Sequence, residues 1–75
     1  MERYANRGGH SNVVAFEIEQ YSIKVQFGDG SIYLYTSQSA GAANLDQMKQ
    51  LARAGQGLNS FISRAVRKGY SSKLR

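Results

Sequence analysis

Basic residues at helical spacing are the strongest candidates for chemistry in this chain of 75 residues. A helix would gather Arg64, Arg67 and Lys68 on one side, and Arg53 lies upstream of them. Cations arranged in this way contact successive phosphates of a nucleic acid. The same spacing also fits cations near the C-terminus of a helix, where the helix dipole would stabilise each by about 0.3–1 kcal/mol. The sequence leaves both interpretations open.

A pair of tyrosines is the second candidate. Tyr33 and Tyr35 stand two positions apart, which places them on the same face of a strand. Exposed aromatic rings stack on nucleobases, and a neighbouring lysine adds a positive charge to such a platform. The expected nucleic-acid-binding residues are therefore Arg64, Arg67, Lys68, Arg53, Tyr33, Tyr35 and Lys24.

Residues that would support catalysis or metal binding are sparse. His10 is the single histidine and follows two glycines, and the chain has no cysteine to supply a thiolate ligand. Glu17 and Glu19 would share one face of a strand, where solvated carboxylates that pair with Lys24 are commoner than an acid–base pair. Residues 55–59 precede a helix whose free N–H groups would suit a phosphate, but a tight turn between helices explains them as well. We expect no enzymatic activity, no metal and no cofactor.

The net charge of +5 is unevenly distributed along the chain. Residues 1–37 contain three Lys and Arg against four Asp and Glu, or −1, whereas residues 38–75 contain seven against one, or +6. A basic half beside a near-neutral half favours an anionic partner such as RNA, although it also serves solubility. No stretch approaches the roughly 20 apolar residues of a membrane span, and the N-terminus lacks the apolar segment of a signal peptide. We expect a cytoplasmic protein without membrane contact.

Three segments alternate between apolar and polar residues and predict an antiparallel β-meander. They are residues 13–19, 21–27 and 31–36, and Gly28-Asp29-Gly30 is the clearest turn between them. The side chains expected to face the core from the first two strands are Val14, Phe16, Ile18, Ile23, Val25 and Phe27.

Two helices should follow a loop of small residues at 37–43. The first begins after Asn44, an expected N-cap with Gln47 three residues on, carries Asp46 in its first turn and ends before Gly55. The second begins near residue 57 or 58 and ends at Gly69, with Leu58, Phe61, Ile62, Ala65 and Val66 on its apolar side. The predicted fold is α+β, a three-stranded antiparallel meander followed by two helices packed on one face. Residues 13–70 form this single domain, between a flexible N-terminal arm at 1–12 and a basic tail at 71–75.

The turn decides which way the two tyrosines face. A two-residue loop at Asp29-Gly30 would place Tyr33 and Tyr35 on the outer face, with Tyr35 opposite Lys24. A three-residue loop that includes Gly28 would shift the pairing by one residue and turn both tyrosines towards the core. In either register residues 31–36 present apolar side chains on both faces. We therefore expect a helix, a second subunit or a ligand to cover the outer face of this third strand.

Four short motifs stand in order along residues 12–70: Ile23-x-Val25-x-Phe27-x-Asp29-Gly30, Tyr33-x-Tyr35, Gly55-x-x-Leu58-Asn59-x-x-Ile62 and Tyr70. Together they resemble the KTSC domain, a small domain at the C-terminus of some bacterial lysyl-tRNA synthetases and in stand-alone bacterial proteins. The resemblance implies a bacterial protein, with Tyr33 and Tyr35 as the family's central tyrosine pair. It also favours the register in which both tyrosines face the helices. The context beside a synthetase implies RNA binding. The chain departs from the pattern at residues 36–43, which form a longer stretch without proline.

These observations lead to an expected function. We expect a small non-catalytic binding module that binds RNA weakly through its basic second helix and its Tyr-x-Tyr strand. The alternative is a protein–protein interaction module or a homodimer that uses the outer face of the third strand.

Overall fold

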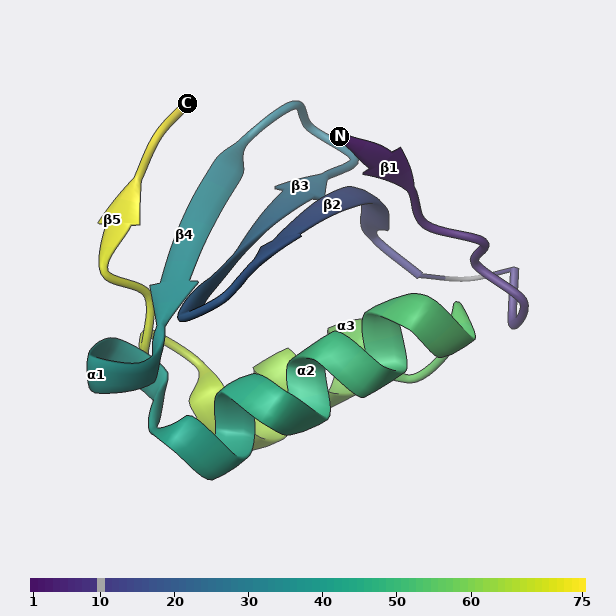
Figure 1. Cartoon of the computed structure of the whole chain (residues 1–75). Helices are drawn as coiled ribbons and strands as arrows, with labels where there is room; N and C mark the ends of the chain where they lie inside the picture. Colours follow the sequence, from purple (N-terminus) through teal and green to yellow (C-terminus); the bar gives the residue numbers. More distant parts are fainter. Residues whose placement is uncertain (10) are drawn as a thin grey trace.

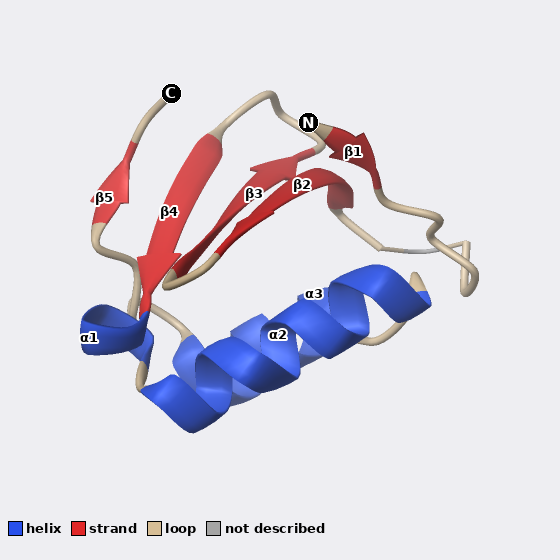
Figure 2. Cartoon of the chain, viewed as in Figure 1, coloured by secondary structure: helices blue, strands red, loops and turns tan. Residues whose placement is uncertain are grey.

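The computed structural model describes residues 1–9 and 11–75, so that His10 lies outside the described residues. The chain is α+β, with an antiparallel sheet whose one face is covered by helices, as predicted (Figures 1 and 2). In the described part of the chain the sheet has five strands rather than the predicted three, in the spatial order β1-β2-β3-β4-β5. These strands are β1 (Glu2–Arg3), β2 (Val13–Glu19), β3 (Ser22–Phe27), β4 (Ile32–Thr36) and β5 (Ser72–Lys73).

The two additional strands come from the segments predicted to be a flexible arm and a tail. β1 pairs with β2, and β5 pairs with β4. The arm is anchored beyond β1 as well, because the Tyr4 ring is only 3% exposed and its hydroxyl accepts a hydrogen bond from the Leu58 N–H (3.3 Å). The Arg7 N–H donates to the Gly55 carbonyl (2.7 Å). Strands of two residues are too short to show a period of two, which is why the sequence pattern misses them.

β2 contains a β-bulge, so the side chains that this strand buries differ from the predicted ones. Val13 pairs with Phe27 and Ala15 with Gln26, so Val14 is the extra residue between them. Val13 is fully buried, whereas Val14, which was expected inside, is 43% exposed. From Phe16 onwards the predicted alternation holds, with Phe16, Ile23 and Val25 all buried.

The turn between β3 and β4 is the three-residue loop, so the tyrosines face the helices. The Phe27 N–H donates to the Ser31 carbonyl (2.9 Å), and Gly30 has φ +90°, a conformation that favours glycine. Val25 therefore pairs with Tyr33, and Lys24 pairs with Leu34 rather than with Tyr35. Ile32 and Leu34 lie on the outer face.

The predicted loop at 37–43 is largely helical. α1 (Ser37–Ala40) is capped by Thr36, whose hydroxyl accepts from the Ser39 N–H while the Ser39 hydroxyl accepts from the Thr36 N–H. α2 (Ala42–Ala54) begins two residues before the predicted cap, and the Asn44 side chain instead donates to the Ala40 carbonyl (2.9 Å). Asp46 consequently falls beyond the first turn.

α2 ends before Gly55, as predicted from the sequence. Gly55 is the C-cap, with φ +76° and its N–H bonded to the Leu51 and Ala52 carbonyls. A Cβ on Gly55 would stand 2.5 Å from the Cβ of Ala5, so glycine also permits the N-terminal segment to pack closely here.

The second predicted helix consists of α3 (Leu58–Phe61) and a π-helical turn, η1 (Ile62–Val66), which closes with the Arg67 N–H bonded to the Ile62 carbonyl (2.6 Å). Leu58, Ile62 and Val66 face the sheet, while Ala65, expected on the same side, is exposed. No described helix is long and apolar enough to cross a membrane. The buried core comprises Tyr4, Val13, Phe16, Ile23, Val25, Tyr35, Leu45, Met48, Ala52, Leu58, Ile62 and Val66.

Candidate functional site: a tyrosine-lined groove

A groove of about 540 Å³ runs between the helix-facing side of the sheet and the end of η1. Its aromatic lining consists of Phe27, Tyr33, Tyr35 and Tyr70, and its charged lining consists of Asp29, Arg67 and Lys68. A volume in this range is typical of sites for small ligands or single groups of a polymer. The groove combines planar apolar surfaces with cations, which is the chemistry needed to hold a nucleotide.

The aromatic rings hold one another in edge-to-face contacts. The centroids of Tyr33 and Tyr70 are 4.7 Å apart at an interplanar angle of 66°, and those of Phe27 and Tyr33 are 5.6 Å apart at 80°. The ring centroids of Tyr35 and Tyr70 are 6.2 Å apart, at an interplanar angle of 88°. Such pairs are each worth about 0.5–1.5 kcal/mol beyond the area they bury. The cluster therefore presents Tyr33 in a fixed orientation.

A lysine side chain lies close to the Tyr33 ring. Lys73 pairs with Tyr33 across β4 and β5, and its Nζ lies 5.8 Å from the ring centroid. This is a cation–π contact, worth about 0.5–1 kcal/mol where the lysine is exposed, as Lys73 is. The Tyr33 ring therefore has a cation within cation–π range.

Two ionisable groups of the groove have shifted pKa values. Burial, with smaller contributions from Tyr33 and Tyr70, raises the pKa of Tyr35 to about 12, so its hydroxyl stays neutral. The Ser31 hydroxyl (2.6 Å) and backbone N–H (3.0 Å) both donate to Asp29 Oδ1 and lower the pKa of Asp29. The groove thus contains one fixed carboxylate among its cations.

The structure brings four of the seven predicted binding residues together. Tyr33, Tyr35, Arg67 and Lys68 line the groove. The tyrosines do so from the helix-facing side, so the outer-face stacking platform that a two-residue loop would have formed is not present. Arg53 and Arg64 are exposed and are not part of the groove lining.

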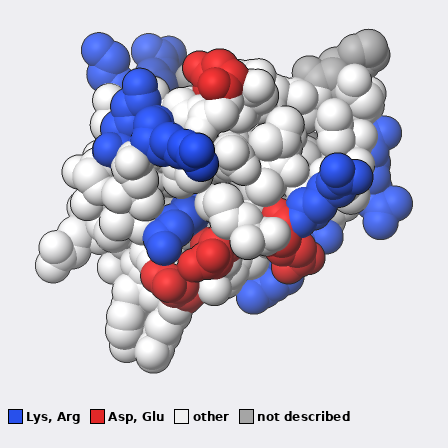
Figure 3. Space-filling view, turned by 90° about the horizontal axis from the view of Figure 1, so that it is seen from above, with Lys and Arg blue, Asp and Glu red and all other residues white. Residues whose placement is uncertain are grey.

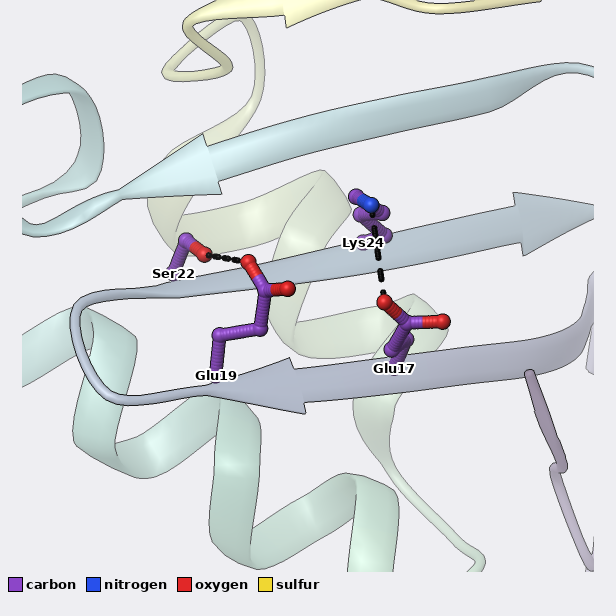
Figure 4. Close-up of polar contacts among 4 residues, drawn as sticks. All are labelled: Glu17, Glu19, Ser22 and Lys24. Carbon is purple, nitrogen blue, oxygen red and sulfur yellow. Dashed lines mark hydrogen bonds and ion pairs between the residues drawn. The ribbon is translucent and has the colours of Figure 1, made fainter.

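Lys24 lies on the opposite face of the sheet. Its Nζ is 3.4 Å from Glu17 Oε2, and both side chains project away from the helices (Figure 4). This confirms the expected cross-strand pairing of Glu17, and Glu19 instead accepts a hydrogen bond from the Ser22 hydroxyl (3.1 Å). Seen from above the sheet, several Lys and Arg side chains gather at one corner, while Asp and Glu lie among the others (Figure 3). Around Lys24 the described basic residues are therefore interspersed with carboxylates.

The start of α3, considered from the sequence as an alternative phosphate site, gains no support from the geometry. At the start of α3 the Leu58 N–H is engaged by the Tyr4 hydroxyl rather than left free for a phosphate. Among the described residues no group of three His, Cys, Asp or Glu side chains is arranged to hold a metal ion.

Sequence reasoning missed three residues that line the groove: Phe27 and Tyr70, whose rings contact Tyr33, and the charged residue Asp29. Tyr70 and Lys73 were assigned to the end of the domain and to the tail. No local pattern marks this segment, because β5 is only two residues long and too short to show alternation.

The comparisons with known proteins add no relative. No family model matches the chain, and neither a curated protein nor a solved structure matches it. The resemblance to the KTSC domain therefore stays a prediction.

Proposed function

We propose that this chain is a small non-catalytic module that binds single-stranded RNA weakly in the tyrosine-lined groove. The proposal includes the predicted bacterial, cytoplasmic KTSC-type setting. The observation that carries it is the juxtaposition of the Tyr33–Tyr70–Phe27 cluster with Arg67 and Lys68 along one groove. Aromatic rings beside a track of cations are the recurrent solution for binding bases and phosphates together.

Stacking of a base on the Tyr33 ring should be more favourable than the cation–π contact that Lys73 makes with it. Stacking of a base on an aromatic side chain is worth about 1–3 kcal/mol. Displacing the exposed Lys73 ammonium from the Tyr33 ring costs about 0.5–1 kcal/mol. The displaced ammonium can then meet a phosphate of the same strand, so that part of this cost is recovered.

The groove suits a single strand better than a duplex. Bases reach an aromatic ring only when they are unstacked, as in loops and free ends of RNA. A groove of about 540 Å³ accommodates very few nucleotides. Few stacked bases and few phosphate contacts together give weak, salt-sensitive binding.

Paired charge-removal variants test this proposal. Arg67→Ala/Lys68→Ala removes two positive charges from the groove, and Lys24→Ala/Arg53→Ala removes two from elsewhere. We expect the groove variant to lose about tenfold or more in affinity for a labelled single-stranded RNA of about eight nucleotides, measured by fluorescence anisotropy at about 50 and 200 mM salt. The second variant should stay within about threefold of the wild type. Equal losses would show general charge attraction and contradict a groove-specific site.

A protein-interaction module or a homodimer is the second candidate function. It is favoured by the outer face of β4, where the register places Ile32 and Leu34. No helix of the described chain covers this side of β4 (Figure 1). Leu74, 49% exposed, is bonded through its N–H to the Ile32 carbonyl and extends this apolar strip. A concentration-dependent mass approaching twice 8.3 kDa would support this candidate. A constant monomer mass would oppose the homodimer.

A further inference from the structure

The turn that follows η1 holds Arg67 in a backbone conformation that glycine favours. Residues 66–69 form a β-turn closed by the Gly69 N–H and the Val66 carbonyl (2.6 Å). Arg67 has φ +44° and ψ −109°, close to the first central position of a type II′ turn. Glycine predominates there because a Cβ crowds the neighbouring backbone.

Packing, rather than the preference of Arg67, enforces this conformation. On one side Val66 is buried in the core, and the π-helical turn ties the Arg67 N–H to the Ile62 carbonyl. On the other side, a Cβ on Gly69 would stand 2.9 Å from the Val66 carbonyl oxygen and 3.3 Å from that of Ser39. The turn is therefore fixed against α1 and against the core, and Arg67 has no freedom to relax. Strained residues of this kind persist where the surrounding structure determines them, and they are concentrated at binding sites.

The side chain at this strained position lines the groove and is not neutralised by a carboxylate. The only ion pair within 4.0 Å among the described residues joins Lys24 and Glu17. Asp29 lines the same groove but hydrogen-bonds Ser31. The Arg67 guanidinium is thus an uncompensated planar cation beside a tyrosine cluster, and a phosphate group fits its paired donors.

We infer that Arg67 anchors a phosphate of the bound strand, at a turn position where glycine would give a more stable protein. This inference rests on the proposed function, and it adds which residue fixes the phosphate and what the fold loses by placing it there. Stability and binding then depend in opposite ways on one residue. Arg67→Gly relieves the strain and removes the guanidinium, whereas Arg67→Ala removes the guanidinium and keeps the strain.

The two variants are compared with the wild type by thermal unfolding and by titration with the same labelled single-stranded RNA. We expect Arg67→Gly to unfold about 2–6 °C higher than Arg67→Ala. Both variants should bind about tenfold more weakly than the wild type. Both should also reduce the slope of log affinity against log salt by about 1. Arg67→Lys keeps the charge but not the paired donors, so its affinity should fall between those of the wild type and Arg67→Ala.

The outcomes separate the possible failures. If the Gly and Ala variants unfold at the same temperature, the strain argument is overturned. If the wild type binds RNA and both variants bind it equally well, the anchoring role is overturned while the proposed function stands. If the wild type binds no RNA, the proposed function fails and the anchoring role fails with it.

Discussion

On β4, Tyr33 and Tyr35 point towards the helices, whereas Ile32 and Leu34 point away from them. The inner pair belongs to an aromatic cluster that also contains Phe27 and Tyr70. The outer pair lies on a face that no helix of the described residues covers (Figure 1). A single strand therefore supplies both the wall of the groove and an apolar strip on the other side. The groove accounts for the aromatic residues on the inner face of β4. The apolar residues on its outer face mark the second candidate interface.

The same comparison separates the basic residues into two groups. Lys24, on the outer face, lies 3.4 Å from Glu17. Arg67 and Lys68 line a groove with tyrosines, and Lys73 lies over the Tyr33 ring. The position of each cation in the fold is thus a better guide to a binding site than the number of cations in the sequence.

The two faces should differ most in their contribution to stability, and neighbouring residues on β2 test this. Phe16 is 2% exposed on the inner face, and replacing it with Ala should lower the free energy of unfolding by about 3–5 kcal/mol. Glu17→Ala on the outer face should cost less than about 1 kcal/mol, because exposed ion pairs contribute little. Urea unfolding followed by circular dichroism measures both. Similar costs for the two variants would break the distinction between the faces.

The buried tyrosine of the inner face should make the protein sensitive to alkali. The pKa of Tyr35 is raised to about 12 in the folded state, so folding favours its protonated form. This contribution is complete below about pH 10 and is lost as the pH rises through about 12, a loss of about 2–3 kcal/mol.

Tyr35→Phe is the matched control for the alkaline loss, since it keeps the ring and removes the titrating hydroxyl. Urea unfolding at about pH 9 and about pH 11.5 should show a steeper decline for the wild type than for the variant. Parallel declines would mean that groups other than Tyr35 govern alkaline unfolding.

The faces should also differ in binding, and adjacent residues of β4 compare them directly. Tyr33→Leu keeps an apolar side chain in the cluster but removes the stacking surface, and should weaken single-stranded RNA binding by about 1–2 kcal/mol. Leu34→Ala, on the outer face, should leave the affinity unchanged. Isothermal titration with the same RNA measures both, and a larger loss for Leu34→Ala would move the site to the outer face.

The smallest effect is expected for the ion pair of the outer face. A double-mutant cycle with Glu17→Ala and Lys24→Ala should give a coupling energy below about 1 kcal/mol, decreasing with added salt. A coupling well above this value, independent of salt, would show that the pair is part of a structured interface rather than a solvated surface.

The central elements could be predicted because their signals are local. Alternation in β2 and β3, the turn at Gly28-Asp29-Gly30 and the helix end at Gly55 each follow from a few adjacent residues. The register at the turn could be narrowed to two possibilities but not chosen, because both loop lengths are common in hairpins.

The remaining features depend on contacts between distant parts of the chain. β1 forms on β2 and Tyr4 reaches Leu58, which stands 54 positions away. β5 brings Lys73 to Tyr33 across the sheet. Only part of the groove could therefore be predicted from the sequence: Tyr33, Tyr35, Arg67 and Lys68 were expected to bind, whereas Tyr70 and the juxtaposition of these side chains were not.

An amide chemical-shift titration by NMR tests the central claim most directly. Short single-stranded RNA is added to the wild-type protein, and the shifts of groove residues are compared with those of the outer face. The account predicts perturbation of Tyr33, Arg67, Lys68 and Tyr70, with Glu17 and Lys24 unchanged. Shifts confined to Glu17, Lys24 and their neighbours, or no shifts together with the linewidths of a dimer, would contradict it.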